Sequence, residues 1–396
     1  MGTLIDSRER RRVVGDHVLM YEDQLVGRTY PDSIVMCSSD YDAHGYPTRP
    51  YFALMPHDEK SRKENHPAPH AQCFVPYRCL LPRGMDGILV TGLGISAHRD
   101  AIALVRMQAD VQNQGYAAGV AAAMAAKAGS GTRGVDVRAL QKHLVEIGNL
   151  PPEVLTQKDS FPLPDAEIAE AVRDVIQADR ARASRALAVV LSHIDKALPL
   201  LRQAFAAAKG ADQLPYAKIL GFQGDASVVP ALVAALDTAA WDEAILQGRM
   251  AEYSHLPTPV DGLVMALGGT RDRRAVPAIL RKLDQLDADA PLSHHRAVAL
   301  ALESIADPAA APALAALLRK PRMSGYTMVN VRPLPAQRSA NDVQSRTPAL
   351  REIVLARALY RCGDQGGMAQ GILKAYEKDL RGLFARHAAA VLAAGK

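Results

Sequence analysis

The sequence predicts an α+β N-terminal part followed by an all-α solenoid, so that the chain is mostly helical. The composition changes near residue 150, where β-prone runs and polar loops give way to almost continuous helical patterns. The later part also repeats one helix–turn–helix pattern four times, and such repeats are typical of α-solenoids. We therefore expect residues 1–150 as one part, a linker and helix at 151–184, and helical repeats at 185–396.

The bulk composition favours a globular protein and no nucleic-acid or membrane partner. The 396 residues, of which 48% are hydrophobic, are enough for two or three domains with cores of their own. A net charge of +5 is a small excess for this length, and the dense cluster Arg8-Glu9-Arg10-Arg11-Arg12 is more typical of a solvated face than of a nucleic-acid surface. No apolar stretch approaches the roughly 20 residues of a membrane span.

Cysteine and histidine usage favours a reduced protein without a metal. The four cysteines, Cys37, Cys73, Cys79 and Cys362, show no C-x-x-C spacing, which favours free thiols and a cytoplasmic location. The N-terminus has no apolar signal region, in keeping with that location. Three histidines between residues 57 and 70 resemble a ligand cluster with Cys73, but their stretch is polar and broken by prolines. We expect a mobile or substrate-capping loop there.

The first 150 residues contain four β-prone runs and one long helix. The β-prone runs are Val13-Val14, 33–36, 73–75 and 88–91. An Ala-rich segment from about Val111 to Ala128 predicts a helix, and the glycines of 129–134 predict its end and a turn. Prolines within 151–164 then interrupt the chain before the helical part begins.

Residues 88–97, ILVTGLGISA, place a glycine loop directly after a β-prone run. Gly92, Gly94 and Ala97 fit G-x-G-x-x-G/A, the loop that carries a dinucleotide pyrophosphate onto a helix N-terminus. An opening Rossmann unit would need a second parallel strand after the helix, with an acidic residue about 20 positions on. Residues 101–148 contain no β-rich run. The loop is therefore not the start of a βαβ unit.

Three separated blocks resemble the C-terminal segment of the FAD-dependent oxidoreductase family. They are residues 8–16, which match the family's R-E-x-R-R-[IV]-x-G-D run, residues 74–129 around the glycine loop, and residues 136–148. In this family the chain returns late to add a last parallel strand to an FAD-binding Rossmann-type domain. The resemblance implies that residues 1–150 are a remnant of such a flavoprotein. It also implies that Ile88 to Thr91 form a parallel strand and that the helix from about Val111 points back at the loop.

The resemblance implies FAD as the cofactor and places seven residues beside it. These are Gly92, Gly94, Ser96, Gln112, Asn113, Gln114 and Gly115. Glycines let the backbone approach a phosphate or ribityl chain closely, and a helix amino end would stabilise reduced flavin. In the family, the opening βαβ unit comes before the position that corresponds to Met1 of this chain. We therefore expect FAD binding by this chain alone to be weak or absent, and an upstream-encoded flavin-binding unit to be a partner.

Four residues near the loop are candidates for catalysis. They are Arg106, His98, Arg99 and Arg78. Related flavoproteins place a substrate-binding cation where Arg106 stands, and His98 with Arg99 would serve as a general acid or base. The alternatives are a helix-surface salt bridge for Arg106 and a solvated helix cap for His98 and Arg99.

Two functions follow from this interpretation. The first is an FAD-dependent oxidoreductase that transfers a hydride between an unidentified substrate and the flavin. The alternative is a non-catalytic interaction or scaffold protein, which retains a flavoprotein remnant and binds a protein partner through its helical repeats. Bound flavin would distinguish the two.

Residues 185–396 repeat one pattern of two helices joined by a turn. The copies lie at 217–236, 264–283, 299–318 and 354–373, and their aligned turn residues are Asp225, Asp272, Asp307 and Asp364. We expect each Asp to cap the second helix, which in the first three copies also carries a Pro in its first turn. The copies resemble HEAT-like repeats of the short, Ala-rich PBS-lyase type. Trp241, His294 and His295 fall among them, and we expect these side chains to pack or cap helices.

We predict that residues 185–396 expressed alone form a helical protein that unfolds cooperatively, because stacked repeats bury a common core. Circular dichroism in the far ultraviolet, recorded during heating, tests this. A disordered spectrum at room temperature would contradict both the boundary and the repeat assignment.

Overall fold

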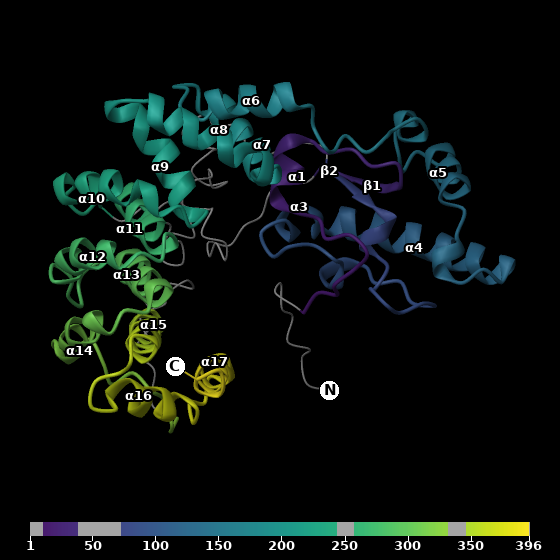
Figure 1. Ribbon diagram of the computed structural model, residues 1–396. Helices are drawn as coiled ribbons and strands as arrows, with labels where there is room; N and C mark the ends of the chain where they lie inside the picture. The colour runs from purple at the N-terminus through teal and green to yellow at the C-terminus, as the bar shows by residue number, and fades with distance from the viewer. Residues whose placement is uncertain (1–10, 39–72, 244–256, 332–345, 396) are drawn as a thin grey trace. The chain divides into compact units, whose positions relative to one another are not determined.

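The computed structural model describes residues 11–38, 73–243, 257–331 and 346–395. The chain forms two compact units, which divide between Leu200 and Leu201. Residues 151–200, expected as a linker and the beginning of the repeats, belong to the first unit by this division. The elements of both units are labelled in Figure 1.

The first unit contains a two-stranded antiparallel sheet. β1 (Ser33–Cys37) pairs with β2 (Cys73–Pro76), and Cys37 lies opposite Cys73. Both strands are largely buried and consist mainly of apolar side chains. Two of the predicted β-prone runs therefore form strands, and they pair with each other.

The prediction of a parallel strand at Ile88 to Thr91 is wrong. This run belongs to no strand, although the Val90 N–H donates to Leu80 O at 2.9 Å. Ile88 is 42% exposed. A β-prone run forms a ladder only where a neighbouring strand offers partners. In the described part of the first unit, β1 and β2 form the only ladder, beside isolated bridges between Gly15 and Pro82 and between Leu19 and Ala97.

Helices form most of the remaining first unit. In chain order they are α1 (Tyr21–Val26), α3 (Ile102–Val105), α4 (Gln108–Ala128), α5 (Val137–Glu146), α6 (Asp165–Asp174) and α7 (Arg180–Ser192), while α8 (Ile194–Ala207) contains the division between the units. Short 3-10 helices lie at Tyr77–Cys79, Gly92–Gly94, Thr132–Gly134 and Pro152–Leu155. The long helix α4 begins three residues before the expected Val111, and it ends as predicted at Gly129, which has a left-handed φ of 63°.

The second unit is a solenoid of paired helices. The pairs are α9 (Gln213–Phe222) with α10 (Val229–Thr238), α11 (Pro259–Gly269) with α12 (Val276–Leu283), α13 (Leu292–Ile305) with α14 (Ala311–Arg319), and α15 (Thr347–Arg361) with α16 (Met368–Tyr376), followed by α17 (Gly382–Ala393). The first helices of the pairs pack side by side in one layer, and α10, α12 and α14 form the other layer (Figure 1). The predicted fold class, an α+β part followed by a helical solenoid, is confirmed.

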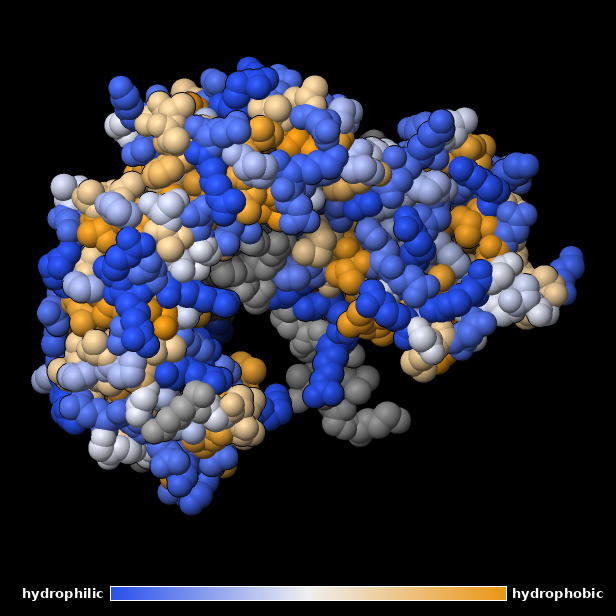
Figure 2. All heavy atoms as spheres, in the orientation of Figure 1, coloured by the Kyte–Doolittle hydropathy of each residue, from blue (hydrophilic) through white to orange (hydrophobic). Residues whose placement is uncertain are grey.

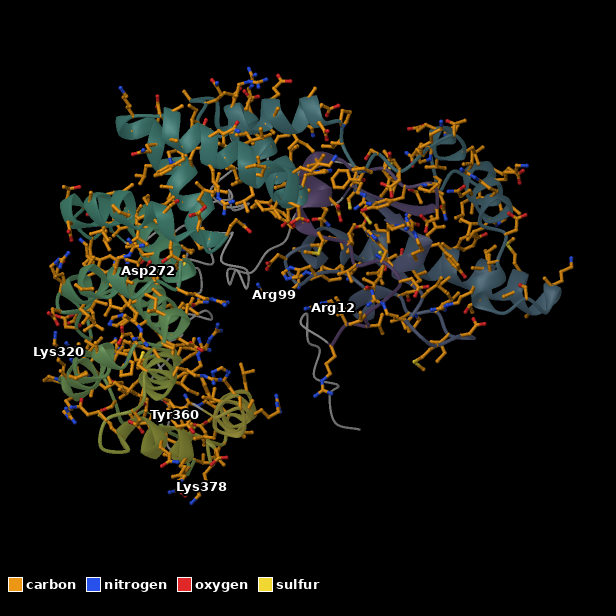
Figure 3. The ribbon with its side chains drawn as sticks, viewed as in Figure 1. Arg12, Arg99, Asp272, Lys320, Tyr360 and Lys378 are labelled. Atoms are coloured by element: carbon orange, nitrogen blue, oxygen red, sulfur yellow. The ribbon has the colours of Figure 1, made fainter. Side chains whose placement is uncertain are left out.

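The repeat aspartates begin the turns between paired helices. Asp225, Asp272 and Asp307 each accept a hydrogen bond from the N–H two residues on, at 2.8 to 3.0 Å, and cap a 3-10 turn before the second helix. Asp272 is labelled in Figure 3. The proline of these three copies lies in the first turn of the following helix, as predicted. Asp364 has a left-handed φ of 61°, and its carboxylate accepts from the N–H groups of Ala369 and Gln370 in α16.

Glycines let the first helices of neighbouring repeats approach closely. A Cβ on Gly268 would lie 2.3 Å from Ala301 Cα, and a Cβ on Gly221 would lie 2.8 Å from Ala266 O. Both distances are too short for non-bonded atoms, so a larger residue would push helix backbones apart. Gly371 in α16 is different, because a Cβ there would meet nothing within 4 Å.

The surface of the second unit is mixed in character. Over α10, α12 and α14, hydrophilic and hydrophobic side chains are interspersed (Figure 2). Of the helices in the described ranges, none combines the length and the apolar character needed to cross a membrane.

We predict that Gly268→Ala lowers the free energy of unfolding by about 1 to 3 kcal/mol, because the added methyl group overlaps the backbone of α13. The matched control is Gly371→Ala, which should raise stability by about 0.5 to 1 kcal/mol because alanine favours a helix more than glycine does. Thermal unfolding followed by circular dichroism measures both. Equal effects of the two substitutions would contradict the close packing of α11 on α13.

Candidate functional site

The glycine loop is a 3-10 turn, Gly92–Gly94, that follows the extended run 88–91. Gly92 has a left-handed φ of 65°, which side chains rarely adopt. A Cβ on Gly94 would lie 3.0 Å from Val90 Cγ1. The turn itself therefore requires Gly92, and Gly94 is tightly packed against Val90, whether or not a ligand approaches.

Gln114 joins the loop to the two helices that follow. Its side chain is fully buried. Oε1 accepts a hydrogen bond from the Gly92 N–H at 3.0 Å, and Nε2 donates to Val105 O, at the end of α3, at 2.7 Å. The predicted approach of the helix to the loop is confirmed, through an amide that satisfies the protein's own backbone.

Ser96 is fully buried and bonded to segments distant in the sequence. Its Oγ accepts from the Gly15 N–H at 2.9 Å, and its N–H donates to Cys79 O at 3.0 Å. A Cβ on Gly15 would lie 2.8 Å from Ser96 Cβ, which explains the glycine in VVGD. Residues 8–16 are the first of the three blocks that resemble the family, and Gly15 in this block thus contacts Ser96 at the end of the glycine loop. Residues 8–10 lie outside the described residues.

Arg78 is bonded to a carboxylate next to the sheet. Its Nε and Nη2 donate to Asp32 Oδ2 and Oδ1, each at 3.0 Å. These hydrogen bonds raise the pKa of Arg78 above its usual value. Because Asp32 directly precedes β1, the bidentate pair holds β1 against the Tyr77–Cys79 turn.

His98, Arg99 and Asp100 form a charged turn between the glycine loop and α3. His98 Nδ1 lies 3.4 Å from Asp100 Oδ2, and Arg99 Nη1 lies 3.4 Å from Asp100 Oδ1. The Asp100 side chain is 1% exposed, whereas those of His98 and Arg99 are 28% and 22% exposed. The Asp100 N–H donates to His98 Nδ1 at 3.3 Å, so Asp100 orients the accessible imidazole through its backbone, while its buried carboxylate lies next to the accessible guanidinium of Arg99. The other imidazole nitrogen, Nε2, is the one that this arrangement leaves for proton transfer. Arg99 is labelled in Figure 3.

Arg106 lies between α3 and α4 and is 8% exposed. The N-cap of α4 is Met107, whose side chain makes no capping hydrogen bond. A 21-residue helix with this start presents N–H groups and the positive end of its dipole. Asp110, buried in the first turn, offsets part of that charge. This end of α4 favours a polar or anionic group.

Gln112, Asn113 and Gly115 lie one turn later in the helix than predicted. Because α4 begins at Gln108, they fall in its second turn, beyond the N–H groups of the first turn. Gln112 and Gly115 are exposed, and Asn113 is half-buried. The expectation of a first-turn position is therefore wrong. These three residues also differ from Gln114, which lies in the same turn but is fully buried.

The second glycine run, 129–134, is anchored by Asp86, which the sequence analysis missed. Asp86 Oδ1 accepts from the Thr132 hydroxyl at 2.6 Å and from the Thr132 N–H at 3.1 Å. The hydroxyl bond is the main reason that the pKa of Asp86 is lowered. Arg133 Nη2 also donates to Pro82 O at 2.7 Å. The run is a turn, as predicted, and its anchors lie far away in the sequence.

A groove of about 290 Å³ lies between α6 and α7. Glu167, Glu170 and Asp174 line it, and Arg182 Nε lies 2.6 Å from Asp174 Oδ2. Its charges are largely paired with one another, and none of the predicted site residues lines it.

The glycine loop, the charged turn, Arg106 and α4 all fall within one family match. Residues 1–144 match the FAD dependent oxidoreductase family. The match confirms the resemblance over this part of the chain. Residues 1–144 therefore form a flavin-oxidoreductase-like domain.

Part of the chain is similar to a solved structure. It is the complex of CpcE and CpcF of phycocyanin lyase from Nostoc sp. PCC7120, with 22% sequence identity and a TM-score of 0.31. The match covers 48% of this chain and 63% of that chain. No curated protein matches the sequence.

The flavin-oxidoreductase-like domain contains some, but not all, of the groups that an FAD molecule would need. The amino end of α4 and Arg106 present N–H groups and a cation, the kinds of group that polar flavin atoms would meet, whereas the Gly92 N–H is already bonded to Gln114. The Ser96 hydroxyl and the Gln114 amide are bonded within the protein, so they support the loop. The described residues contain no parallel βαβ unit, on which a dinucleotide pyrophosphate docks.

Metal binding gains no support from the described residues. No group of three His, Cys, Asp or Glu side chains among them could hold a metal ion. The histidines between residues 57 and 70 lie outside the described ranges, and Cys73 lies in β2. Burial raises the pKa of Cys73 and of Cys79, which makes both thiols poor nucleophiles.

We predict that Gln114→Ala lowers the free energy of unfolding by about 2 to 4 kcal/mol, because it leaves a buried N–H and a buried C=O without partners. Gln112→Ala is the matched control on the exposed side of the same helix, and it should change stability by less than about 0.5 kcal/mol. Amide hydrogen exchange at Gly92 should accelerate only in Gln114→Ala. Unchanged protection of Gly92 would contradict the role of this amide.

Proposed function

We propose that residues 1–144 bind the ribityl and pyrimidine side of FAD as part of a flavin-dependent oxidoreductase. The observation that carries the proposal is the amino end of α4, which begins without a side-chain cap next to Arg106 and is tied to the Gly92 turn by Gln114. Reduced flavin accumulates negative charge on its pyrimidine ring, and a helix amino end with a nearby cation stabilises such charge. FAD would supply the donor or acceptor of a hydride when bound.

Arg106 and the charged turn supply the other chemistry in this proposal. Arg106 holds an anionic group of the substrate. His98, oriented by Asp100, exchanges a proton with the substrate, while Arg99 adds a cation next to the same carboxylate. Arg78 contributes as a positioning residue, because its guanidinium is bonded to Asp32.

The proposal includes a partner that completes the FAD site. Ile88 is exposed, and the run from Ile88 to Thr91 belongs to no strand of the described first unit. A sheet edge from an upstream-encoded flavin-binding unit would pair with this run and bring the βαβ unit that holds the pyrophosphate. The chain alone then binds FAD weakly or not at all, since much of the ligand surface stays uncovered.

A non-catalytic interaction protein is the second candidate. It is favoured by the internal bonding of Ser96, Gln114 and Arg78, because polar groups that satisfy one another need no ligand. The flavin-oxidoreductase-like part would then be a scaffold attached to the helical repeats, which would bind a protein partner. Both candidates are proposed as cytoplasmic proteins, and the four free, buried cysteines support this location.

We predict that the purified chain retains little flavin after desalting, and that an added βαβ-containing unit restores binding, because the missing contacts hold the pyrophosphate. Flavins absorb between roughly 350 and 500 nm, with a maximum at about 450 nm. The absorbance of the protein fraction in this range measures how much flavin the protein retains. Stoichiometric FAD on the chain alone would contradict the need for a partner. A colourless protein in both preparations would favour the second candidate.

In the reconstituted flavoprotein, Arg106→Ala should lower the midpoint potential of the flavin by roughly 30 mV, because losing about 1.4 kcal/mol of charge stabilisation shifts a two-electron couple by that amount. Arg83→Ala is the control, since Arg83 is exposed in the same domain. Redox titration followed by absorbance measures both. A potential unchanged by Arg106→Ala would remove this residue from the site.

A further inference from the structure

A histidine and an aspartate form a pair in the interior of the second unit. His294, in α13, is 1% exposed, and Asp261, in α11, is 0% exposed. His294 Nδ1 lies 2.8 Å from Asp261 Oδ1, and Asp261 Oδ2 accepts a hydrogen bond from the Thr258 N–H at 2.9 Å. A backbone donor on the second oxygen favours the ionised carboxylate. One nitrogen of the imidazole therefore meets an acceptor.

The other ring nitrogen of His294 also meets an acceptor. Nε2 lies 3.0 Å from the backbone oxygen of Asp242, which has no proton to donate. A neutral imidazole carries one N–H group, whereas an imidazolium carries two. Because both partners of the ring are oxygen acceptors, both hydrogen bonds form only when each nitrogen carries a proton. The network therefore holds one proton more than neutral His294 and ionised Asp261 would hold apart.

Trp241 covers this imidazole. Its ring is half-buried and stacked on the His294 ring, with centroids 4.3 Å apart and planes at 20°. The indole N–H donates to Lys282 O at 3.3 Å, and the Val260 N–H donates to Asp242 Oδ2 at 2.8 Å. Residues 239–242, which we call the latch, are thus held against α11, α12 and α13. A cation stacked on an indole is stabilised by the negative face of the ring.

The other charged groups near the imidazole do not replace its proton. Lys282, in α12, donates from Nζ to a backbone oxygen of the latch. Burial lowers the pKa of Lys282, although Asp237 and Asp242 act in the opposite direction. Burial also lowers the pKa of His295, the neighbour of His294 in α13, to about 4, and the Arg351 cation of α15 adds to this effect. His295 is therefore neutral at pH 7.

We propose that the latch is a pH-sensitive conformational device, closed while the His294 ring carries two protons and released when it loses one. A ring with a single N–H keeps its bond to the Asp261 carboxylate, the stronger acceptor, and loses its bond to Asp242 O. It also loses the charge that favours stacking on Trp241. The stability that the latch contributes is therefore present at low pH and lost as the pH rises.

The latch and its partners lie wholly within the second unit, so they are tested independently of flavin binding. Trp241 is the sole tryptophan of the chain, so tryptophan fluorescence reports on the latch. The test is a titration of the full chain between about pH 5 and pH 9, the range in which histidine changes charge. A stacked imidazolium quenches indole emission, so emission should increase about twofold or more as the pH rises. Acrylamide should then quench Trp241 more efficiently, because the released ring is open to solvent.

Two variants of the pair show whether it holds the proton. His294→Gln should abolish the transition, because glutamine does not titrate. Asp261→Asn should move the transition to lower pH by about one unit or more, because the imidazolium loses its counter-charge. His143→Gln is the matched control, since His143 also contacts an aromatic ring, that of Tyr116, but lies in the first unit. It should leave the transition unchanged.

If a variant of the pair fails to fold, the acrylamide measurement on the parent chain still tests the release of the latch. Constant emission over the whole pH range, a transition that survives in folded His294→Gln, or equal acrylamide quenching on both sides of the transition would overturn the proposal. A transition that His143→Gln abolishes would also overturn it.

Discussion

The amide of Gln114 is the interaction on which the arrangement of the flavin-oxidoreductase-like domain depends. One side chain supplies the acceptor that the Gly92 N–H needs and the donor that Val105 O needs. Each buried backbone group would otherwise cost about 1 to 3 kcal/mol. The turn, α3 and α4 therefore hold one geometry, in which Arg106 and the amino end of α4 stay together.

Partners for backbone groups also organise the repeats, by a different device. Asp225, Asp272 and Asp307 satisfy N–H groups at the turn, while Gly221 and Gly268 remove the side chains that would keep neighbouring helices apart. The turn and the contact are both local features of each repeat. Stacking then follows from repetition.

The two units offer different binding chemistry. The flavin-oxidoreductase-like domain offers N–H groups and cations next to a turn whose own polar side chains are already satisfied, and these are the groups that we propose for the ribityl and pyrimidine side of a flavin. The solenoid instead offers a surface on which hydrophilic and hydrophobic side chains are interspersed over α10, α12 and α14. A chain that combines them would join a flavin-linked reaction to a protein partner, or would use the first unit only as a scaffold.

The sequence alone determined the features whose causes lie close together in the chain. The repeat aspartates, the prolines after them and the left-handed Gly129 were predictable because a helix end and its cap are separated by only a few residues. Tertiary structure decided the rest. Ser96 was predicted next to FAD, yet its hydroxyl meets Gly15, 81 residues earlier, and Arg78 meets Asp32, 46 residues earlier. The run from Ile88 to Thr91 has strand-forming residues but belongs to no strand of the described chain, because strand pairing depends on a neighbour that local sequence does not specify.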